Sequence, residues 1–227
     1  MNNVPIIVIS SSAKETGKTT LALNLAAALW SDGYRVQLFA PDNYKVAEFI
    51  EQRKNLCKQS GVRLPLPQSL INLDEVAEND AKTVIIADIP TVDNKKYADV
   101  FAKAHTLISV GTKMRDFQWQ MTDPYLGLIW EAKKNIAARG VKYLNWIAVL
   151  NQLQNSEEIP LAELHGAAKR FGFRAAEPLH ARNAFRYVEN GYCAADMAKF
   201  PQLFKMSMQD VYARREILTL TDFLWKK

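Results

Sequence analysis

The chain is poor in the residues that build metal clusters and disulfide frameworks. It contains two cysteines, Cys57 and Cys193, and three histidines among 227 residues. The cysteines are far apart, and neither has a further Cys or His at the spacing of a zinc ligand. We therefore expect no zinc site, no disulfide framework and two reduced thiols.

Long apolar runs are also missing. The longest ones have the length of a β-strand, whereas a membrane-spanning helix needs about 20 apolar residues in a row. The first residues, Met-Asn-Asn-Val-Pro, hold no basic segment ahead of an apolar one. We therefore expect no signal peptide, no membrane span and a cytoplasmic location. No linker divides the sequence, which favours a single domain over residues 1–227.

The most informative stretch joins an apolar run, a small polar turn and an Ala-rich helix. Residues 6–9 are four β-branched residues, which suit a buried strand, and residues 21–29 carry a leucine at every fourth position. Gly17-Lys18-Thr19 lies between them. The first turn of a helix offers free N–H groups to anions, and a lysine and a hydroxyl there can hold phosphate and Mg²⁺. The pattern predicts a phosphate-binding loop; alternatively, these residues only begin an ordinary helix.

Alternation of strands and helices predicts the fold class. Further strand-like runs lie at 35–40, 83–91, 106–110, 143–150 and 171–177, and helical patterns at 44–58, 96–104, 123–139, 161–171, 183–190 and 202–224, with 69–81 helical or irregular. We expect an α/β protein with a doubly wound, mostly parallel sheet flanked by helices. Asp88 ends one buried run, where an acid can hold a metal-bound water or simply cap the next turn.

In this order, the features resemble the ParA/MinD family, P-loop ATPases with a deviant Walker A motif, and most of all its ParA-type partition ATPases. The family positions plasmids, chromosomes or division machinery. The resemblance spans nearly the whole chain. It is carried by the loop and the helix after it, the segment from Gly33 to Asp42, the strand end at Asp88, Asn151-Gln152, and the segment from Pro178 to Gly191.

The resemblance implies ATP or ADP with Mg²⁺ as ligands of a P-loop NTPase-like domain. It assigns Lys18 to the β- and γ-phosphates, Thr19 and Asp88 to Mg²⁺, and Asp42 to orienting the attacking water. The remaining nucleotide contacts that it implies are Thr16, Gly17, Thr20, Asn151 and Pro178. Asn151 would recognise adenine, although a turn residue closing a strand is an equal alternative.

Two departures from the family pattern limit the prediction of hydrolysis. The signature lysine, which reaches the phosphates of the partner subunit in a dimer, is replaced by Ala13, and the nearest lysine is Lys14. The first acid of the D-x-D pair is replaced by Ala40. We therefore expect nucleotide binding rather than fast hydrolysis. The catalytic role of the lysine across the dimer is either shifted to Lys14 or lost, and its loss would make hydrolysis slow.

The resemblance also implies partners: a homodimer formed with nucleotide, non-specific DNA, and a partner or cargo adaptor protein. The net charge of +5 fits DNA contact, although a solvated basic face is the alternative. Basic residues of the second half are Lys133, Lys134, Arg139, Lys142, Lys169, Arg170, Arg174, Arg182, Arg186, Lys199, Lys205, Arg214 and Arg215. The tail of residues 217–227 is either a membrane-targeting helix or, as we expect, a helix docked on its own domain.

Two other functions remain open at this point. Glu15 before x-Gly-Lys-Thr is similar to the phosphate loop of dethiobiotin synthetase, an ATP-dependent biosynthetic ligase. Ala13 and Ala40 instead fit a nucleotide-binding adaptor that hydrolyses ATP poorly.

Overall fold

Seven parallel strands form one open sheet in the computed structural model, which describes residues 4–41, 43–73, 82–91, 94–122, 124–140, 143–154 and 161–226. In chain order they are β1 (Ile6–Ser10), β2 (Arg35–Phe39), β3 (Gln68–Leu70), β4 (Thr83–Asp88), β5 (Thr106–Gly111), β6 (Asn145–Leu150) and β7 (Arg174–Ala175). Their order across the sheet is β3-β2-β4-β1-β5-β6-β7, and neighbours pair in parallel. The predicted fold class is confirmed.

The middle of the sheet determines where a ligand can bind. All residues of β1, β4 and β5 are buried, as expected for Ile- and Val-rich parallel strands covered on both faces. β1 pairs with β4 on one side and with β5 on the other, so the strand order switches direction at β1. Ligands of open α/β sheets bind at the carboxyl ends of strands at such a switch point. The loop after β1 begins there.

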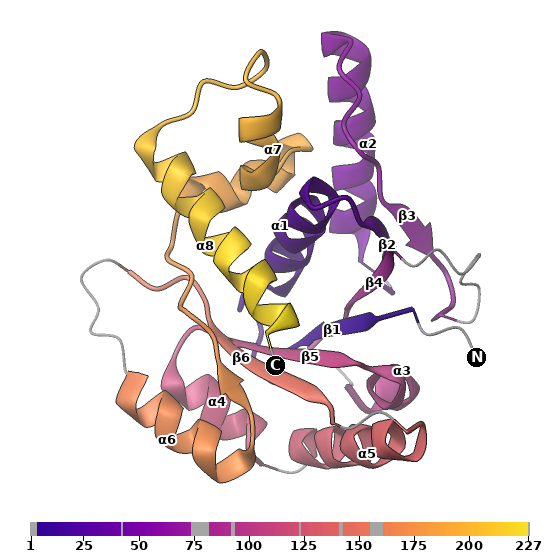
Figure 1. The fold of residues 1–227 in the computed structure, drawn as a ribbon, viewed down its shortest axis with the longest axis vertical. Coiled ribbons are helices and arrows are strands. Elements are labelled where there is room, and N and C mark those ends of the chain that lie inside the picture. Colours follow the sequence, from indigo (N-terminus) through magenta and orange to yellow (C-terminus); the bar gives the residue numbers. More distant parts are fainter. Residues whose placement is uncertain are drawn as a thin grey trace.

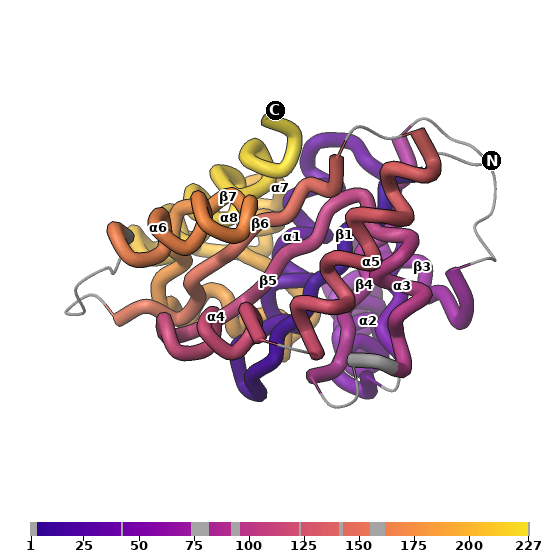
Figure 2. Tube along the Cα trace, turned by 90° about the horizontal axis from the view of Figure 1, so that it is seen from below, coloured from indigo at the N-terminus to yellow at the C-terminus, as the bar shows by residue number. Residues whose placement is uncertain are grey.

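Helices cover both faces of the sheet (Figures 1 and 2). One layer holds α1 (Lys18–Ser31), α2 (Tyr44–Ser60), the 3₁₀ segment η3 (Asn183–Asn190), α7 (Ala194–Lys199) and α8 (Met208–Trp225). The other holds η2 (Asn94–Tyr97), α3 (Ala98–Lys103), α4 (Met114–Gln120), α5 (Tyr125–Ala138) and α6 (Leu161–Phe171). Each layer buries its own apolar cluster against the sheet, which holds the strand ends in fixed positions.

The C-terminal tail is part of a docked helix. Ile217, Leu220 and Leu224 of α8 are buried in the same cluster as α1, which confirms the docked alternative over a free membrane-targeting helix. No helix within the described ranges is long and apolar enough to cross a membrane. Both cysteines are free thiols, with Cys193 buried and Cys57 half-buried.

The structure corrects several boundaries predicted from the sequence. Residues 69 and 70, expected at the start of a helical or irregular segment over 69–81, belong to the edge strand β3, whose Gln68 accepts at Oε1 a hydrogen bond from Gln37 Nε2 at 2.9 Å. A three-residue edge strand directly after two prolines gives no periodic signal. Residues 74–81 lie outside the described part. The helix predicted over 202–224 starts only at Met208, because Ser207 caps it, and α4 and α7 were not predicted.

Candidate nucleotide-binding site

Gly17 closes the loop after β1 and is required by its surroundings. Its φ of 79° lies in the left-handed region, and α1 begins at the next residue. A Cβ atom on Gly17 would lie 2.6 Å from Asn151 Nδ2 and 2.9 Å from Gln152 Nε2. Glycine is therefore needed here both for the backbone conformation and for the close approach of the residues that follow β6.

The loop is fastened to the end of β6 by side-chain hydrogen bonds. Asn151 Nδ2 donates to the carbonyl oxygen of Thr16 at 2.8 Å, and Gln152 Nε2 donates to that of Glu15 at 3.2 Å. Glu15 and Gln152 both have positive φ, at 57° and 61°, which is uncommon for residues other than glycine. The amide nitrogen of Asn151 thus holds the loop in place. Asn151 also lines the cavity described below.

Lys18 extends over the loop toward the end of β4. Its Nζ donates to Thr91 Oγ1, and Thr91 Oγ1 donates in turn to the carbonyl oxygen of Ala13 at 3.0 Å. Burial lowers the pKa of Lys18 below its usual value, and the nearby charge of Asp88 opposes this effect. A desolvated ammonium at a helix N-terminus strongly favours an anionic partner.

A hydroxyl, a carboxylate and an amide meet beside Lys18. Thr19 Oγ1 donates to Asp88 Oδ2 at 2.7 Å, and Asn43 Nδ2 donates to both of these oxygens, at 2.9 Å and 2.7 Å. Asp88 is 3% exposed. Burial raises its pKa, while the hydrogen bond from Thr19, the charge of Lys18 and the hydrogen bond from Asn43 act against the rise. A divalent cation at Asp88 would offset the cost of burying this carboxylate.

The oxygen atoms of Thr19 and Asp88 can hold Mg²⁺ only together with oxygen ligands from another source. Thr19 and Asp88 supply the hard oxygen atoms that Mg²⁺ prefers, but the described residues contain no group of three His, Cys, Asp or Glu side chains able to hold a metal. Mg²⁺ is commonly bound by one or two protein ligands plus substrate phosphates. These residues therefore fit a Mg²⁺ ion that arrives with a phosphate compound.

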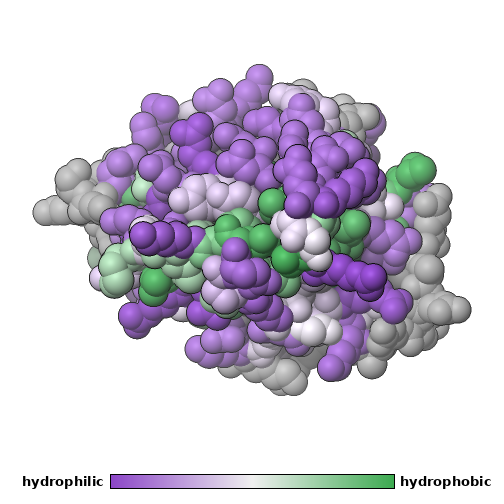
Figure 3. Space-filling model, turned by 90° about the horizontal axis from the view of Figure 1, so that it is seen from above, coloured by the Kyte–Doolittle hydropathy of each residue, from purple (hydrophilic) through white to green (hydrophobic). Residues whose placement is uncertain are grey.

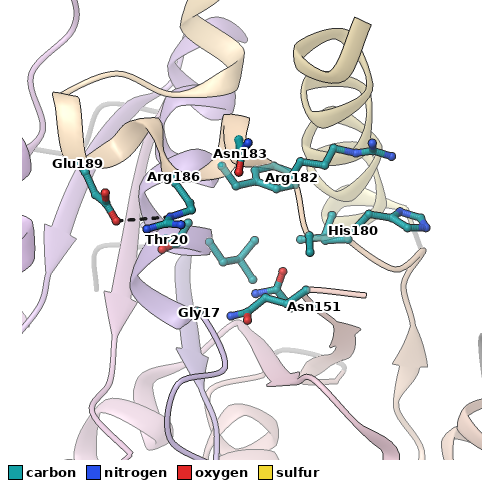
Figure 4. A pocket seen from close by; sticks show the side chains of 13 residues that line it. Gly17, Thr20, Asn151, His180, Arg182, Asn183, Arg186 and Glu189 are labelled. Carbon is teal, nitrogen blue, oxygen red and sulfur yellow. Dashed lines mark ion pairs between the residues drawn. The ribbon is translucent and has the colours of Figure 1, made fainter. Parts of the chain in front are cut away.

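A cavity of about 420 Å³ adjoins the loop on the side of α1 and η3 (Figure 4). Its floor includes Gly17 and Asn151, and its apolar lining is Leu21, Leu179, Ala181 and Phe185. Its polar lining is Thr20, Gln152, His180, Arg182, Asn183, Arg186 and Glu189, of which Arg186 and Glu189 form an ion pair at 3.8 Å. The volume and the mixed lining suit a small planar ligand such as a nucleobase.

The structure brings together most of the residues predicted for the site. Those gathered around the loop are Thr16, Gly17, Lys18, Thr19, Thr20, Asp88 and Asn151. Pro178 is buried and directly precedes the cavity wall. Lys14 is exposed on the loop, whereas Ala13 is buried. Asp42 lies outside the described residues, so its predicted role stays a prediction.

Sequence reasoning missed Asn43 and Thr91. Both follow strands, β2 and β4, whose carboxyl ends reach the loop, and this position is the signal that could have identified them. It also missed Arg182, Asn183 and Arg186, whose place in the cavity depends on how η3 packs against α1.

Together, the open parallel sheet, the loop before α1 and Asp88 at the end of β4 define a P-loop NTPase-like α/β protein. The family model described as ATPase MipZ matches residues 5–104 and 82–225. The chain therefore belongs to the ATPase MipZ family, within the ParA/MinD group, and the resemblance inferred from the sequence is confirmed.

Three solved structures illustrate the shared fold. MinD of Pyrococcus horikoshii, complexed with Mg-ADP, is 16% identical with a TM-score of 0.57 over 98% of this chain and 96% of that one. McdA of Cyanothece, in a complex with ATP, is 13% identical, with a TM-score of 0.56 over 99% and 97%. Cobyrinic acid a,c-diamide synthase of Mycobacterium smegmatis, with ADP and magnesium, is 14% identical, with a TM-score of 0.51 over 88% and 96%. The search of curated proteins gave no match.

Proposed function

We propose that this chain is an ATP-dependent switch that binds ATP with Mg²⁺ at the loop after β1 and hydrolyses it slowly. The observation that carries the proposal is the joint placement of Lys18, Thr19 and Asp88 around the start of α1, beside a cavity large enough for a nucleobase. Membership of the ATPase MipZ family supports it, and so do the Mg-ADP and ATP bound in the MinD and McdA structures. The switch positions a cargo such as DNA or a plasmid through a partner protein.

The residues divide the work of holding the nucleotide. Lys18 and the free N–H groups at the start of α1 bind the β- and γ-phosphates. Thr19 and Asp88 hold Mg²⁺, which supplies charge neutralisation on the phosphates when bound. The base lies in the cavity, where the carbonyl oxygen of the Asn151 side chain can accept a hydrogen bond from adenine, because the amide nitrogen is already used by Thr16. Asp42 orients the attacking water.

Lys14 supplies the additional positive charge for hydrolysis. It is exposed on the loop, next to buried Ala13, whose carbonyl oxygen is held by Thr91. An exposed lysine there is available to the phosphates of a second copy, where it would act like an arginine finger. This role requires a homodimer formed with nucleotide.

Dimer mass and ATP turnover of the Lys14→Ala variant test this part of the proposal. With ATP and Mg²⁺, the wild-type chain is expected to reach the mass of a dimer in light scattering, and the variant to hydrolyse ATP at least about tenfold more slowly. Lys58→Ala, at an exposed lysine of α2, is the matched control. Equal turnover in all three chains would exclude a catalytic Lys14, and turnover at background level in the wild-type chain would favour an adaptor with little hydrolysis.

The proposed DNA contact is non-specific and involves the layer of α5 and α6. Several basic residues of the second half are already engaged within the chain: Arg139, Arg174, Arg182 and Lys199 donate to carbonyl or carboxylate oxygens. Lys134, Lys169 and Arg170 are exposed on α5 and α6, which both lie toward the viewer in Figure 2. The view from above instead shows an apolar band between polar margins (Figure 3), which suits phosphates poorly.

Salt-dependent binding tests the DNA contact. With ATP and Mg²⁺, affinity for a random duplex should fall steeply as salt rises, and Lys169→Gln with Arg170→Gln should reduce the logarithmic slope by about 2. Lys205→Gln, at an exposed lysine before α8, is the control. Salt-independent binding, or no binding with ATP, would contradict the DNA contact and leave the nucleotide site unaffected.

A further inference from the structure

One carboxylate of the C-terminal helix holds the outer wall of the cavity. Glu216, in the middle of α8, is 16% exposed at its side chain. Its Oε2 accepts a hydrogen bond from the backbone N–H of His180 at 3.0 Å, and its Oε1 lies 3.0 Å from His180 Nδ1. Arg182 donates to Oε1 from Nε at 2.9 Å and from a terminal nitrogen at 2.6 Å. Four contacts from two residues of the wall thus converge on Glu216.

The polar ends of His180 and Arg182 point away from the cavity. Both side chains extend toward α8, so the wall that faces the cavity is formed by backbone and by the stems of these side chains (Figure 4). The guanidinium of Arg182 also donates to Gln209 Oε1 at 2.6 Å and lies 5.2 Å from the ring centre of Tyr212. These polar groups therefore anchor the wall to α8, and are poorly placed to contact a ligand themselves.

On the side facing the sheet, backbone hydrogen bonds hold the wall, including those from Ala176 N to Ala148 O at 3.0 Å and from Leu179 N to Leu150 O at 2.9 Å. Residues 176–182 form no helix or strand apart from the isolated bridge between His180 and Leu153. On that side, Leu153 N donates to the carbonyl oxygen of Leu179 at 3.1 Å, and Ala181 N to that of Leu153 at 2.9 Å. Leu153 fixes the wall relative to the sheet, and Glu216 fixes its opposite side relative to α8. Loss of Glu216 would leave one side of the segment without its charge-assisted hydrogen bonds.

We infer that Glu216 is a positioning residue for the base of the nucleotide, acting through His180 and Arg182 and touching no ligand itself. This inference rests on the proposed function, because it assigns the cavity to the base and the loop of residues 11–20 to the phosphates. A base bound in a preformed cavity gains affinity from walls that need not be ordered on binding. The C-terminal helix thereby contributes to recognition of the base and has no part in holding the phosphates.

The test compares ATP with inorganic tripolyphosphate, which carries the phosphates without sugar or base. Calorimetric titrations with Mg²⁺ are expected to show that Glu216→Gln weakens ATP binding about tenfold, while tripolyphosphate binds as it does to the wild-type chain. Asp222→Asn, at an exposed carboxylate of the same helix, should change neither. Equal weakening of both ligands, or of neither, would overturn the inference.

A second variant controls for the case in which Glu216→Gln impairs folding. Gln209→Ala removes one support of Arg182 without touching Glu216, and it should weaken ATP binding in the same selective way by about threefold. Selective weakening in this variant, together with an unchanged melting temperature, supports the positioning role; no selectivity in either variant overturns it. If the wild-type chain does not bind ATP at all, the proposed function and this inference are both overturned. If the wild-type chain binds ATP and Glu216→Gln binds it equally well, only the inference is overturned.

Discussion

The side-chain amide of Asn43 donates a hydrogen bond to the carboxylate of Asp88 at 2.7 Å, and the same nitrogen donates to Thr19 Oγ1 at 2.9 Å. These are the two oxygens that the proposed site offers to Mg²⁺. An amide N–H and a cation compete for the same lone pairs. Asn43 also caps α2, because its Oδ1 accepts a hydrogen bond from Lys45 N at 3.2 Å. Because Asn43 takes part in both sets of hydrogen bonds, binding of Mg²⁺ is linked to the conformation of the residue that caps α2.

Asn43→Ser is predicted to lower the Mg²⁺ concentration needed for ATP binding. Serine retains the cap of α2 but is too short to reach Asp88, so the competing hydrogen bonds disappear. Net hydrogen-bond energies of about 0.5 to 1.5 kcal/mol correspond to a shift of roughly twofold to thirteenfold. The shift is measured by titrating Mg²⁺ at fixed ATP. A need for more Mg²⁺ in the variant would show instead that Asn43 helps to hold the ion.

Gly17→Ala is predicted to weaken both folding and nucleotide binding. The new Cβ would meet Asn151 Nδ2 at 2.6 Å, in a backbone conformation that costs alanine about 1 kcal/mol or more. Urea unfolding and ATP titration measure the two losses. Gly166→Ala is the matched control, because Gly166 is exposed within α6 and a Cβ there meets nothing within 4 Å. That change should stabilise by about 0.5 to 1 kcal/mol; similar effects at both glycines would contradict the close contact at Gly17.

Stability is predicted to fall when the solution becomes acidic enough to protonate His105. Burial lowers the pKa of His105 below 6.5, with a smaller contribution from Arg139, and its Nδ1 accepts a hydrogen bond from Ile6 N at 3.2 Å. Below pH 6.5 the unfolded chain binds a proton that the folded chain resists, so the free energy of unfolding decreases as pH falls through the window just below 6.5. Above this window His105 is neutral in both the folded and the unfolded chain, so it adds no pH dependence there.

Unfolding in urea at several pH values measures this dependence. His105→Gln should make the free energy of unfolding less sensitive to pH in the window just below 6.5. His165→Gln, at an exposed histidine of α6, should leave the dependence as in the wild-type chain. An unchanged slope in His105→Gln would mean that another group is responsible.

Arg53→Met is predicted to destabilise the chain strongly. The guanidinium is fully buried and donates to both oxygens of Asp196, at 2.7 and 2.8 Å, and so joins α2 to α7. Removing the cation leaves a buried carboxylate without its partner, which costs about 3 to 5 kcal/mol. Urea unfolding measures the loss, and Arg53→Met combined with Asp196→Leu should recover part of it, because no unpaired charge is then buried, although the cap that Asp196 provides for α7 is also lost. A loss in the double variant equal to that in Arg53→Met would contradict this explanation.

The sequence predicted the centre of the fold well because its signals there are local. Runs of Ile and Val identified β1, β4 and β5, and Gly-Lys-Thr at the start of an Ala-rich helix identified the loop. The edge strand β3 escaped detection because three residues after two prolines carry no pattern. The strand β3 forms only because β2 provides a free edge with which it can pair.

Side chains that act through distant partners could not be predicted. Asn43 gains its role only when the end of β2 lies beside Asp88, and Glu216 only when α8 packs next to residues 176–182. Arg53 and Asp196 are separated by 143 positions in the chain. Spacing along the sequence contains no information on such pairs, whereas the packing of the two helical layers determines them.

Calorimetric titration of ATP into the wild-type and Lys18→Ala chains, with and without Mg²⁺, tests the central claim most directly. The account predicts binding to the wild-type chain that strengthens with Mg²⁺, and a loss of at least about tenfold in Lys18→Ala, because the ammonium that holds the phosphates is gone. Replacing a half-buried lysine should leave the fold intact, which a melting curve verifies. No ATP binding by the wild-type chain, or equal binding by Lys18→Ala, would contradict the account.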